Sequence, residues 1–240
     1  MLLWLIVLIA LICAIARCQS QTLTSLYCLY DQSQISQVKE IAAYRAANKL
    51  PPLHVVINPN DGPSTSDLRK PFLAIKNTVL IGYVPTEART ALEIRSDLQT
   101  WHAAKVPMIF LDDTHAWDIK AEADKLSTTV WIAIQGTGYT TDKIILNPGG
   151  PVKASAWMRQ KSWLVCDFED PVSRLKDAST GPVWLAFVRN DAEAQKVIAT
   201  ARKRKVRFIG FDRYSSWKVP GEEWQTTLPS DLVARLKTLQ

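Results

Sequence analysis

Eight short apolar runs recur along the chain, and each one opens onto a loop rich in Asn, Asp, Gly, Pro or Thr. Most of these runs are continuous rather than alternating, which is typical of parallel strands buried on both faces. Amphipathic stretches lie between them, most clearly at Ile35–Asn48, Ala91–Lys105 and Asp191–Lys205. Strands that alternate with helices predict βα units, and eight such units predict a closed (β/α)8 barrel of the TIM type. The eight runs are Ser25–Tyr30, Leu53–Asn58, Thr78–Val84, Pro107–Asp112, Lys143–Asn147, Ser162–Phe168, Pro182–Val188 and Val206–Phe211.

One segment leaves an alternative open. Thr129–Gln135 is rich in β-branched residues, and if it is a strand, the barrel count fails and a doubly wound open sheet results. We interpret it as a helix end or as a segment packed outside the barrel. No linker, repeat or low-complexity tract marks a second domain, so we expect residues 19–240 to form a single barrel domain.

The first sixteen residues are almost wholly apolar and carry no charge, and Ala14-Ile15-Ala16 has the small-x-small form of a signal-peptidase site. The run is at the short limit for a bilayer span of roughly 20 residues, which favours an export signal over a permanent anchor. Arg17 follows an uncharged start, which keeps an uncleaved anchor as the alternative. We therefore expect residues 1–18 to be a signal peptide or a membrane anchor, and the barrel to be secreted or extracytoplasmic. Contact with a membrane is expected only through this segment.

The chain is mildly basic, with a formal charge of +6 and its densest basic run at Arg202–Lys205. That run ends an expected helix, where cations complement the helix dipole. Since no aromatic interleaving or second basic face accompanies it, we expect no nucleic-acid partner. His54, His102 and His115 have no ligand-like spacing and the sequence has no CxxC pair, so we predict no metal and no other cofactor. We expect a monomer.

Three cysteines follow the first sixteen residues, namely Cys18, Cys28 and Cys166, and an odd number leaves at least one thiol outside any disulfide. Cys28 and Cys166 fall in two of the apolar runs. We expect both to pack as small core hydrophobes.

Polar side chains gather where the apolar runs end. In a TIM barrel all these ends share one face, which is the face that carries catalysis. Carboxylates at the ends of buried strands must be desolvated or paired, and active sites are where that cost is usually accepted. Taken singly, each has a simpler interpretation as turn chemistry, a helix cap or a surface charge. The residues concerned are Asn58, Asn60, Tyr83, Thr86, Arg89, Asp112, Asp113, Asn147, Glu169, Asp212 and Tyr214.

This set predicts glycoside hydrolysis. The reaction needs a carboxylic acid to protonate the leaving oxygen and a second group to attack or stabilise the anomeric carbon. Asp112 or Asp113 on the fourth run and Glu169 on the sixth supply the pair, since alternate barrel strands point into the same layer. Successive strand residues face opposite sides, so both aspartates enter the site only if the strand ends or bulges there. We expect aromatic side chains near the strand ends to stack on sugar rings or to cap the core: Tyr30, Tyr83, Trp117, Tyr214 and Trp217.

Five segments resemble the spherulin-4 (spherulation-specific) family of glycoside hydrolases, and they come in the family order. They are Val55–Pro63, Gly82–Thr86 followed by Arg89, Ile109–Asp113, Leu146–Gly150 and Val165–Glu169. The resemblance implies a (β/α)8 fold and an endo-acting enzyme for α-1,4-linked galactosamine or N-acetylgalactosamine polysaccharide. It places Asp112 and Asp113 at the paired acidic position of the fourth strand and Glu169 at the acidic position of the sixth. The substrate-binding residues expected around them are Asn58, Asn60, Tyr83, Thr86, Arg89, Asn147, Asp212, Tyr214 and Trp217.

The sequence departs from the family pattern at two places. Asp113 stands where relatives carry Glu, which shortens the reach of that carboxylate by one methylene. The seventh run ends in Val188-Arg189-Asn190, where a His or another small polar residue is expected. The alternative function is therefore a carbohydrate-binding or cell-surface barrel without catalysis, and neutralising Asp112 or Glu169 distinguishes it from an enzyme. A metal-dependent hydrolase is a third class, which the histidine spacing disfavours.

Overall fold

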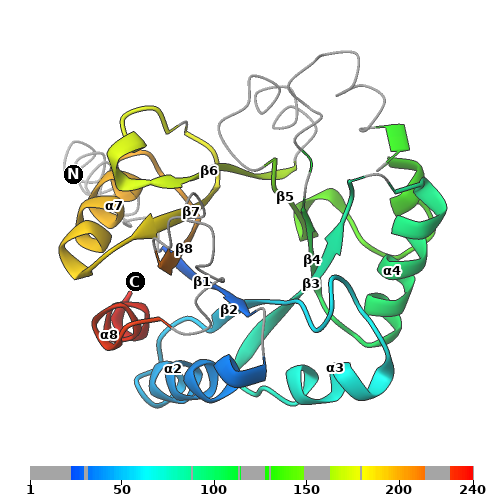
Figure 1. Ribbon diagram of the computed structural model, residues 1–240, viewed down its shortest axis with the longest axis horizontal. Helices are drawn as coiled ribbons and strands as arrows, with labels where there is room; N and C mark the ends of the chain where they lie inside the picture. Colours follow the sequence, from blue (N-terminus) through cyan, green and yellow to red (C-terminus); the bar gives the residue numbers. More distant parts are fainter. Residues whose placement is uncertain are drawn as a thin grey trace, which may run out of the picture.

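Eight parallel strands close into a barrel in the order in which they follow one another along the chain (Figure 1). β1 pairs with β2 on one side and with β8 on the other, so the sheet closes on itself and the predicted (β/α)8 fold is confirmed. The strands are β1 Thr24–Leu29, β2 Leu53–Ile57, β3 Thr78–Pro85, β4 Met108–Asp112, β5 Ile144–Leu146, β6 Leu164–Pro171, β7 Val183–Val188 and β8 Phe208–Arg213. The computed structural model describes residues 23–29, 32–87, 89–112, 114, 128–129, 131–148, 163–178, 180–213 and 228–239.

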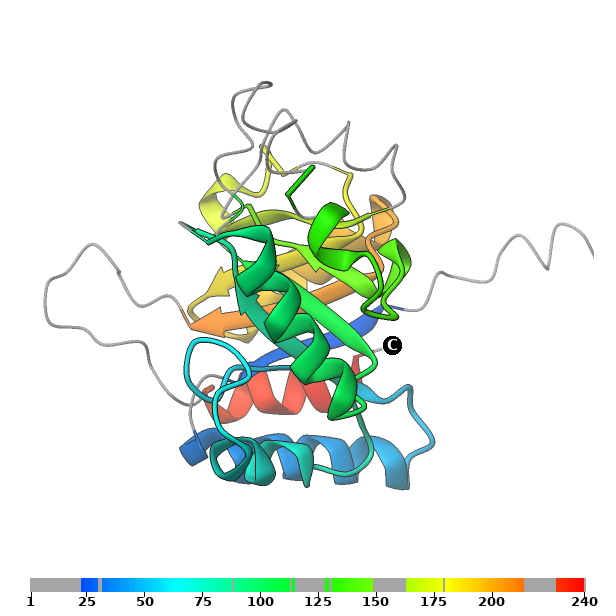
Figure 2. The same cartoon turned by 90° about the vertical axis from the view of Figure 1, so that its right-hand side faces the viewer.

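Helices cover the outside of the barrel. Figure 2 shows α4 lying across the strands on one side, with α2 and α8 next to each other below. The helices are α2 Ile35–Ala47, α3 Ser66–Leu73, α4 Ala91–Ala103, α7 Asp191–Lys203 and α8 Ser230–Thr238, with short 3-10 turns at η1 Gln32–Gln34, η3 Thr141–Lys143 and η4 Val172–Arg174.

The ambiguous segment at Thr129–Gln135 contributes no strand. Residues 128–129 and 131–134 are helical, and β4 pairs directly with β5. The open-sheet alternative is therefore wrong, and the segment is the helical piece outside the barrel that we expected. Within the described ranges, none of the helices has the length and apolar character that a bilayer crossing requires. The predicted leader, residues 1–18, lies outside the described residues.

Buried side chains form two apolar groups. One fills the barrel interior and includes Leu26, Phe110 and Cys166, with Cys28 packed against it. The other fills the space between strands and helices. Burial raises the pKa of the Cys166 thiol well above its usual range, and the nearby Glu169 carboxylate adds to the rise. Cys166 therefore stays protonated and packs as a small apolar residue, as expected from the sequence.

β6 contains a β-bulge that decides where its acidic residues point. Cys166 and Phe168 are opposite consecutive residues of β7, so Asp167 is the extra residue. Cys166 belongs to the barrel interior and Phe168 to the outer group. Because side chains alternate along a regular strand, Glu169 would otherwise face outward with Asp167. The bulge reverses the alternation and brings Glu169 to the barrel mouth.

Gly82 on β3 lets α4 approach the sheet closely. A Cβ at Gly82 would lie 2.6 Å from two ring atoms of the wholly buried Trp101. The indole Nε1 of Trp101 in turn donates to the Tyr83 carbonyl oxygen at 2.9 Å. The glycine of the Gly-Tyr-Val motif thus has a packing role, and it helps to position the tyrosine that follows it.

We predict that Gly82→Ala destabilises the protein by about 1–3 kcal/mol, the usual cost of overpacking a filled core. The free energy of unfolding in urea measures this. Gly136→Ala is the control, because a Cβ there meets no atom within 4 Å and the change is limited to the strain of a backbone φ of +75°. Equal stability of the Gly82→Ala and parent proteins would contradict the role assigned to the close packing.

Candidate active site

The centre of the site is Asn147, directly after β5. Its side-chain Nδ2 donates to Asp112 Oδ1 at 2.6 Å and to Glu169 Oε2 at 2.8 Å. The three residues come from the carboxyl ends of neighbouring strands β4, β5 and β6. Asn147 is only 2% exposed, and its backbone N–H donates to the Leu111 carbonyl at 2.8 Å. A rigid, buried amide therefore holds the two predicted carboxylates next to each other.

Tyr83 of β3 and Thr86, directly after β3, hold Asp112 in place. The hydroxyl of Tyr83 donates to Asp112 Oδ2 at 2.9 Å, so both carboxylate oxygens of Asp112 accept a hydrogen bond. Thr86 holds the backbone, since its N–H and its Oγ1 donate to the Asp112 carbonyl at 3.0 and 2.7 Å. The structure thus places Asp112, Asn147, Glu169, Tyr83 and Thr86 in one network.

Three further predicted residues make other contacts. Asn58 Oδ1 accepts from the Gly62 N–H at 3.0 Å and closes the turn after β2, while Asn60 is exposed on that turn. Arg89 forms an ion pair with Asp97 of α4 at 2.7 Å, and it also donates to the Pro85 carbonyl at 3.3 Å. These contacts do not involve the carboxylate pair. They give Asn58 and Arg89 structural roles beside the site.

The remaining predictions fall at or beyond the limits of the described residues. Asp212 is the last residue but one of β8, and its side chain is not described. The other residues lie outside the described ranges: Asp113, Tyr214, Trp217, Tyr30 and Trp117.

Two acidic residues of β6 were missed by the sequence analysis. Asp167 is wholly buried, and a Cβ on Gly181 would lie 1.9 Å from its Oδ2, so a glycine is needed there. Asp170 is 8% exposed and pairs with Arg174 at 2.9 Å. Burial raises the pKa of Asp170, while Arg174 opposes the rise. The run Asp167-Phe168-Glu169-Asp170 was the available signal, since three carboxylates at the end of one buried strand are unusual.

The two histidines that the structure describes, His54 and His102, have their ring contacts outside this network. His54 lies in β2 with its ring edge-to-face against Phe208, and burial lowers its pKa. In the part of the chain that the structure describes, no group of three or more His, Cys, Asp or Glu side chains is arranged to hold a metal ion. The chemistry available to the described residues is that of paired carboxylates.

Replacing Asn147 by leucine, which is close to it in size, is expected to lower kcat/KM by on the order of 10²-fold, the loss typical for one preorganised donor. The two carboxylates lose the group that separates and orients them. Kinetics on the substrate proposed below, with circular dichroism to verify folding, measure the effect. Asn48→Leu is the matched control, because the Asn48 amide donates to the Tyr44 carbonyl at a helix end, away from the carboxylates. Unchanged activity of Asn147→Leu would contradict the central role of the amide.

The barrel and its paired carboxylates define a TIM-barrel protein with an acidic site at the carboxyl ends of its strands. Residues 36–208 match the family described as "Spherulation-specific family 4". The chain belongs to the spherulin-4 family, which confirms the resemblance seen in its motifs.

Solved structures with the same architecture are similar in fold alone. The GH99 endo-alpha-mannosidase from Bacteroides thetaiotaomicron has a TM-score of 0.50 and 9% identity, over 87% of this chain and 79% of that one. A DAHP synthase from Thermotoga maritima has a TM-score of 0.48 and 11% identity, over 90% of this chain and 67% of that one. No curated protein matches the sequence.

Proposed function

We propose that the protein is an endo-acting glycoside hydrolase for α-1,4-linked galactosamine or N-acetylgalactosamine polysaccharide. The single observation that carries the proposal is the Asn147 amide, which contacts both Asp112 and Glu169. Family membership supports the proposed substrate class. An extracellular polymer as substrate also fits the apolar first sixteen residues, for which we propose export.

The hydrogen bonds support different roles for the two carboxylates. Both oxygens of Asp112 already accept hydrogen bonds, so Asp112 is the group proposed to act as the anion. It attacks the anomeric carbon from the face opposite the leaving oxygen. Glu169 gives its proton to the glycosidic oxygen as that C–O bond breaks. It then takes a proton from the water that displaces the intermediate, which restores both groups.

The closeness of the pair bears on stereochemistry. Because one nitrogen contacts both oxygens, Asp112 Oδ1 and Glu169 Oε2 lie no farther apart than the two bonds end to end. These two oxygens are thus at most about 5.4 Å apart, which fits the spacing in retaining glycosidases (~5–5.5 Å) better than that in inverting ones (~6.5–9.5 Å).

We therefore predict that the first product keeps the α configuration at its new reducing end. Proton NMR of a reaction followed from its first minutes, before the anomers equilibrate, measures this. A first product with the β configuration would contradict the two-step route and would require a water molecule between the carboxylates.

The proposed function is tested by reducing-end release from soluble galactosamine polymers, N-acetylated and free, beside chitosan-like polymers. Residues 19–240 are the protein to use. Release from the α-1,4-linked galactosamine polymers, and not from the chitosan-like controls, is the expected result. Binding of these polymers by folded protein without any release would favour the non-catalytic barrel.

A further inference from the structure

A pocket lies beside the proposed active site, between the end of β6 and the start of α7. Its volume is about 150 Å³. A second hollow of about 370 Å³ shares four of its residues and continues along the first turns of α7, past Asn190 to Lys196. The pocket is lined by Pro171, Val172, Ser173, Phe187, Arg189 and Glu193.

The pocket lies on the catalytic face of the barrel. Pro171 is two residues beyond Glu169 on β6, which is roughly 7 Å along the strand. Phe187 is opposite Pro171 on β7 and two residues beyond Leu185, whose side chain lies in the barrel interior. The alternation of strand side chains therefore turns Phe187 toward the mouth. A polysaccharide that is cleaved at Glu169 extends past Pro171 and Phe187 with its neighbouring sugar units.

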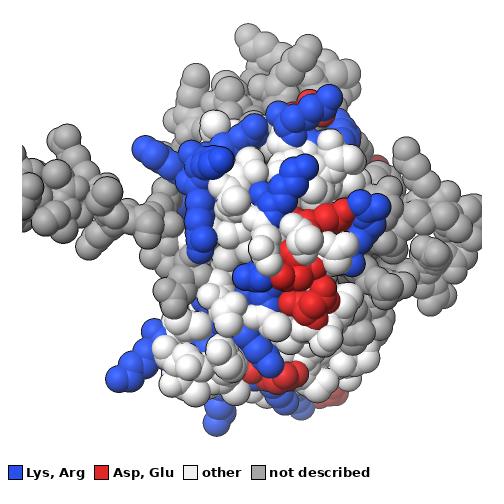
Figure 3. Space-filling model, turned by 90° about the vertical axis from the view of Figure 1, so that its left-hand side faces the viewer, with Lys and Arg blue, Asp and Glu red and all other residues white. Residues whose placement is uncertain are grey.

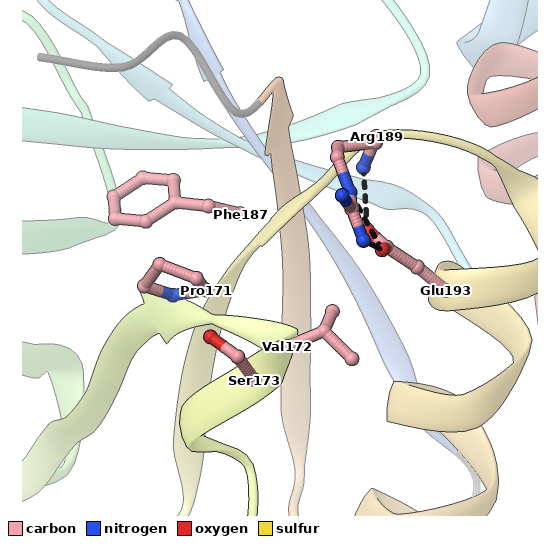
Figure 4. A pocket seen from close by; sticks show the side chains of 6 residues that line it. All are labelled: Pro171, Val172, Ser173, Phe187, Arg189 and Glu193. Carbon is pink, nitrogen blue, oxygen red and sulfur yellow. Dashed lines mark hydrogen bonds and ion pairs between the residues drawn. The ribbon is translucent and has the colours of Figure 1, made fainter.

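The two sides of the pocket differ in character. Figure 4 shows the rings of Phe187 and Pro171 on one side and the Arg189–Glu193 pair on the other. Phe187 is 8% exposed, so only a small part of its ring is open to the pocket, beside Pro171. An apolar side of this kind contacts the C–H groups of a pyranose ring.

The polar side of the pocket carries the hydrogen-bond donors of Arg189, whose charge is balanced by that of Glu193. Glu193 accepts from the Arg189 backbone N–H at 2.8 Å and from its Nε at 2.7 Å, and it also contacts Nη2. The Glu193 side chain is 16% exposed and that of Arg189 is 71% exposed, so the carboxylate fixes a guanidinium that faces solvent. Figure 3 shows basic and acidic side chains next to each other on this side of the molecule. A compensated pair of this kind suits hydroxyl groups better than a charged ligand.

We propose that this pocket is a subsite that binds an uncharged pyranosyl unit of the polysaccharide, next to the unit cleaved at Glu169. The subsite rests on the proposed function. Phe187 and Pro171 contact the C–H groups of the sugar ring, and Arg189, held by Glu193, donates hydrogen bonds to its hydroxyl groups. Arg189, which stands where the family pattern has a small polar residue, thereby determines how this chain holds long substrates.

A size-graded series of α-1,4-linked N-acetylgalactosamine oligomers tests the subsite. For the parent protein, kcat/KM rises from the shortest to the longest oligomers. Phe187→Leu keeps apolar volume but loses the ring face, and Arg189→Gln loses the guanidinium. We expect each to reduce the advantage of long over short oligomers by about tenfold, equivalent to ~1.4 kcal/mol.

Arg235→Gln is the matched control. Arg235 also forms a bidentate ion pair with an acidic residue of α7, Asp191, at 2.7 and 2.8 Å. Arg235 itself lies on α8, outside the pocket. Arg235→Gln should leave the dependence of kcat/KM on oligomer length unchanged. If the parent cleaves the oligomers and both pocket variants keep the full advantage of long ones, the subsite is overturned while the proposed function stands. A folded parent that neither binds nor cleaves any oligomer overturns both.

Discussion

Asp112→Asn is expected to lower kcat by on the order of 10⁴-fold or more, the scale seen when the attacking group of an enzyme is removed. Asparagine has the same shape and can still contact Tyr83 and Asn147, so the fold is expected to remain intact. It has no negative charge with which to attack the anomeric carbon. The loss should therefore be equally large on the polymer and on an aryl glycoside with a good leaving group.

The control for this variant is Asp67→Asn, which removes a surface carboxylate that is 84% exposed and paired with Lys70. Rates are measured on both substrates, and thermal unfolding verifies that the variants are folded. If Asp112→Asn were impaired on the polymer but nearly normal on the aryl glycoside, Asp112 would be the proton donor and the assignment of the two roles would be reversed.

Glu169→Gln is expected to lower kcat on the polymer by on the order of 10²- to 10⁴-fold, the usual contribution of a positioned general acid. The glutamine carbonyl can still accept from Asn147, but the side chain cannot protonate the leaving oxygen. A dinitrophenolate leaves without a proton, so formation of the intermediate should be nearly normal on a dinitrophenyl glycoside. A burst of dinitrophenolate followed by slow turnover is the signature, because the water that completes the reaction also lacks its base.

Glu40→Gln serves as the control, since Glu40 is a half-exposed helix residue paired with Lys237 at 2.6 Å. Equal losses on the two substrates, without a burst, would contradict the acid–base role of Glu169.

The fold was predictable because the buried strands are clearly visible in this sequence as apolar runs that alternate with polar loops. Runs such as Leu53–Asn58 and Pro182–Val188 are mostly apolar, and polar residues follow them, from Asn58 in the first case and from Arg189 in the second. The structure places β2 and β7 at those positions. The position of the candidate site was predictable for the same reason. The carboxyl ends of the strands of a barrel meet on one face, whatever side chains the strands carry.

The details that depend on tertiary geometry were not predictable. The bulge at Asp167 turns Glu169 toward the mouth of the barrel, but no local residue pattern predicts this bulge. The bridging role of Asn147 depends on the packing of three strands, whereas Asn-Pro-Gly alone indicates only a turn. Arg89 was placed in the site because of its motif. Its partner Asp97 lies eight residues further on, in a helix whose orientation the sequence did not provide.

The most direct test of the account measures reducing ends released from soluble α-1,4-linked N-acetylgalactosamine polymer by the parent, Asp112→Asn and Glu169→Gln proteins, side by side and at equal concentrations of folded protein. We expect steady release by the parent and release slower by on the order of 10²-fold or more by each variant. Release at the parent rate by either variant would contradict the assignment of the Asn147-bridged carboxylates as the hydrolytic centre.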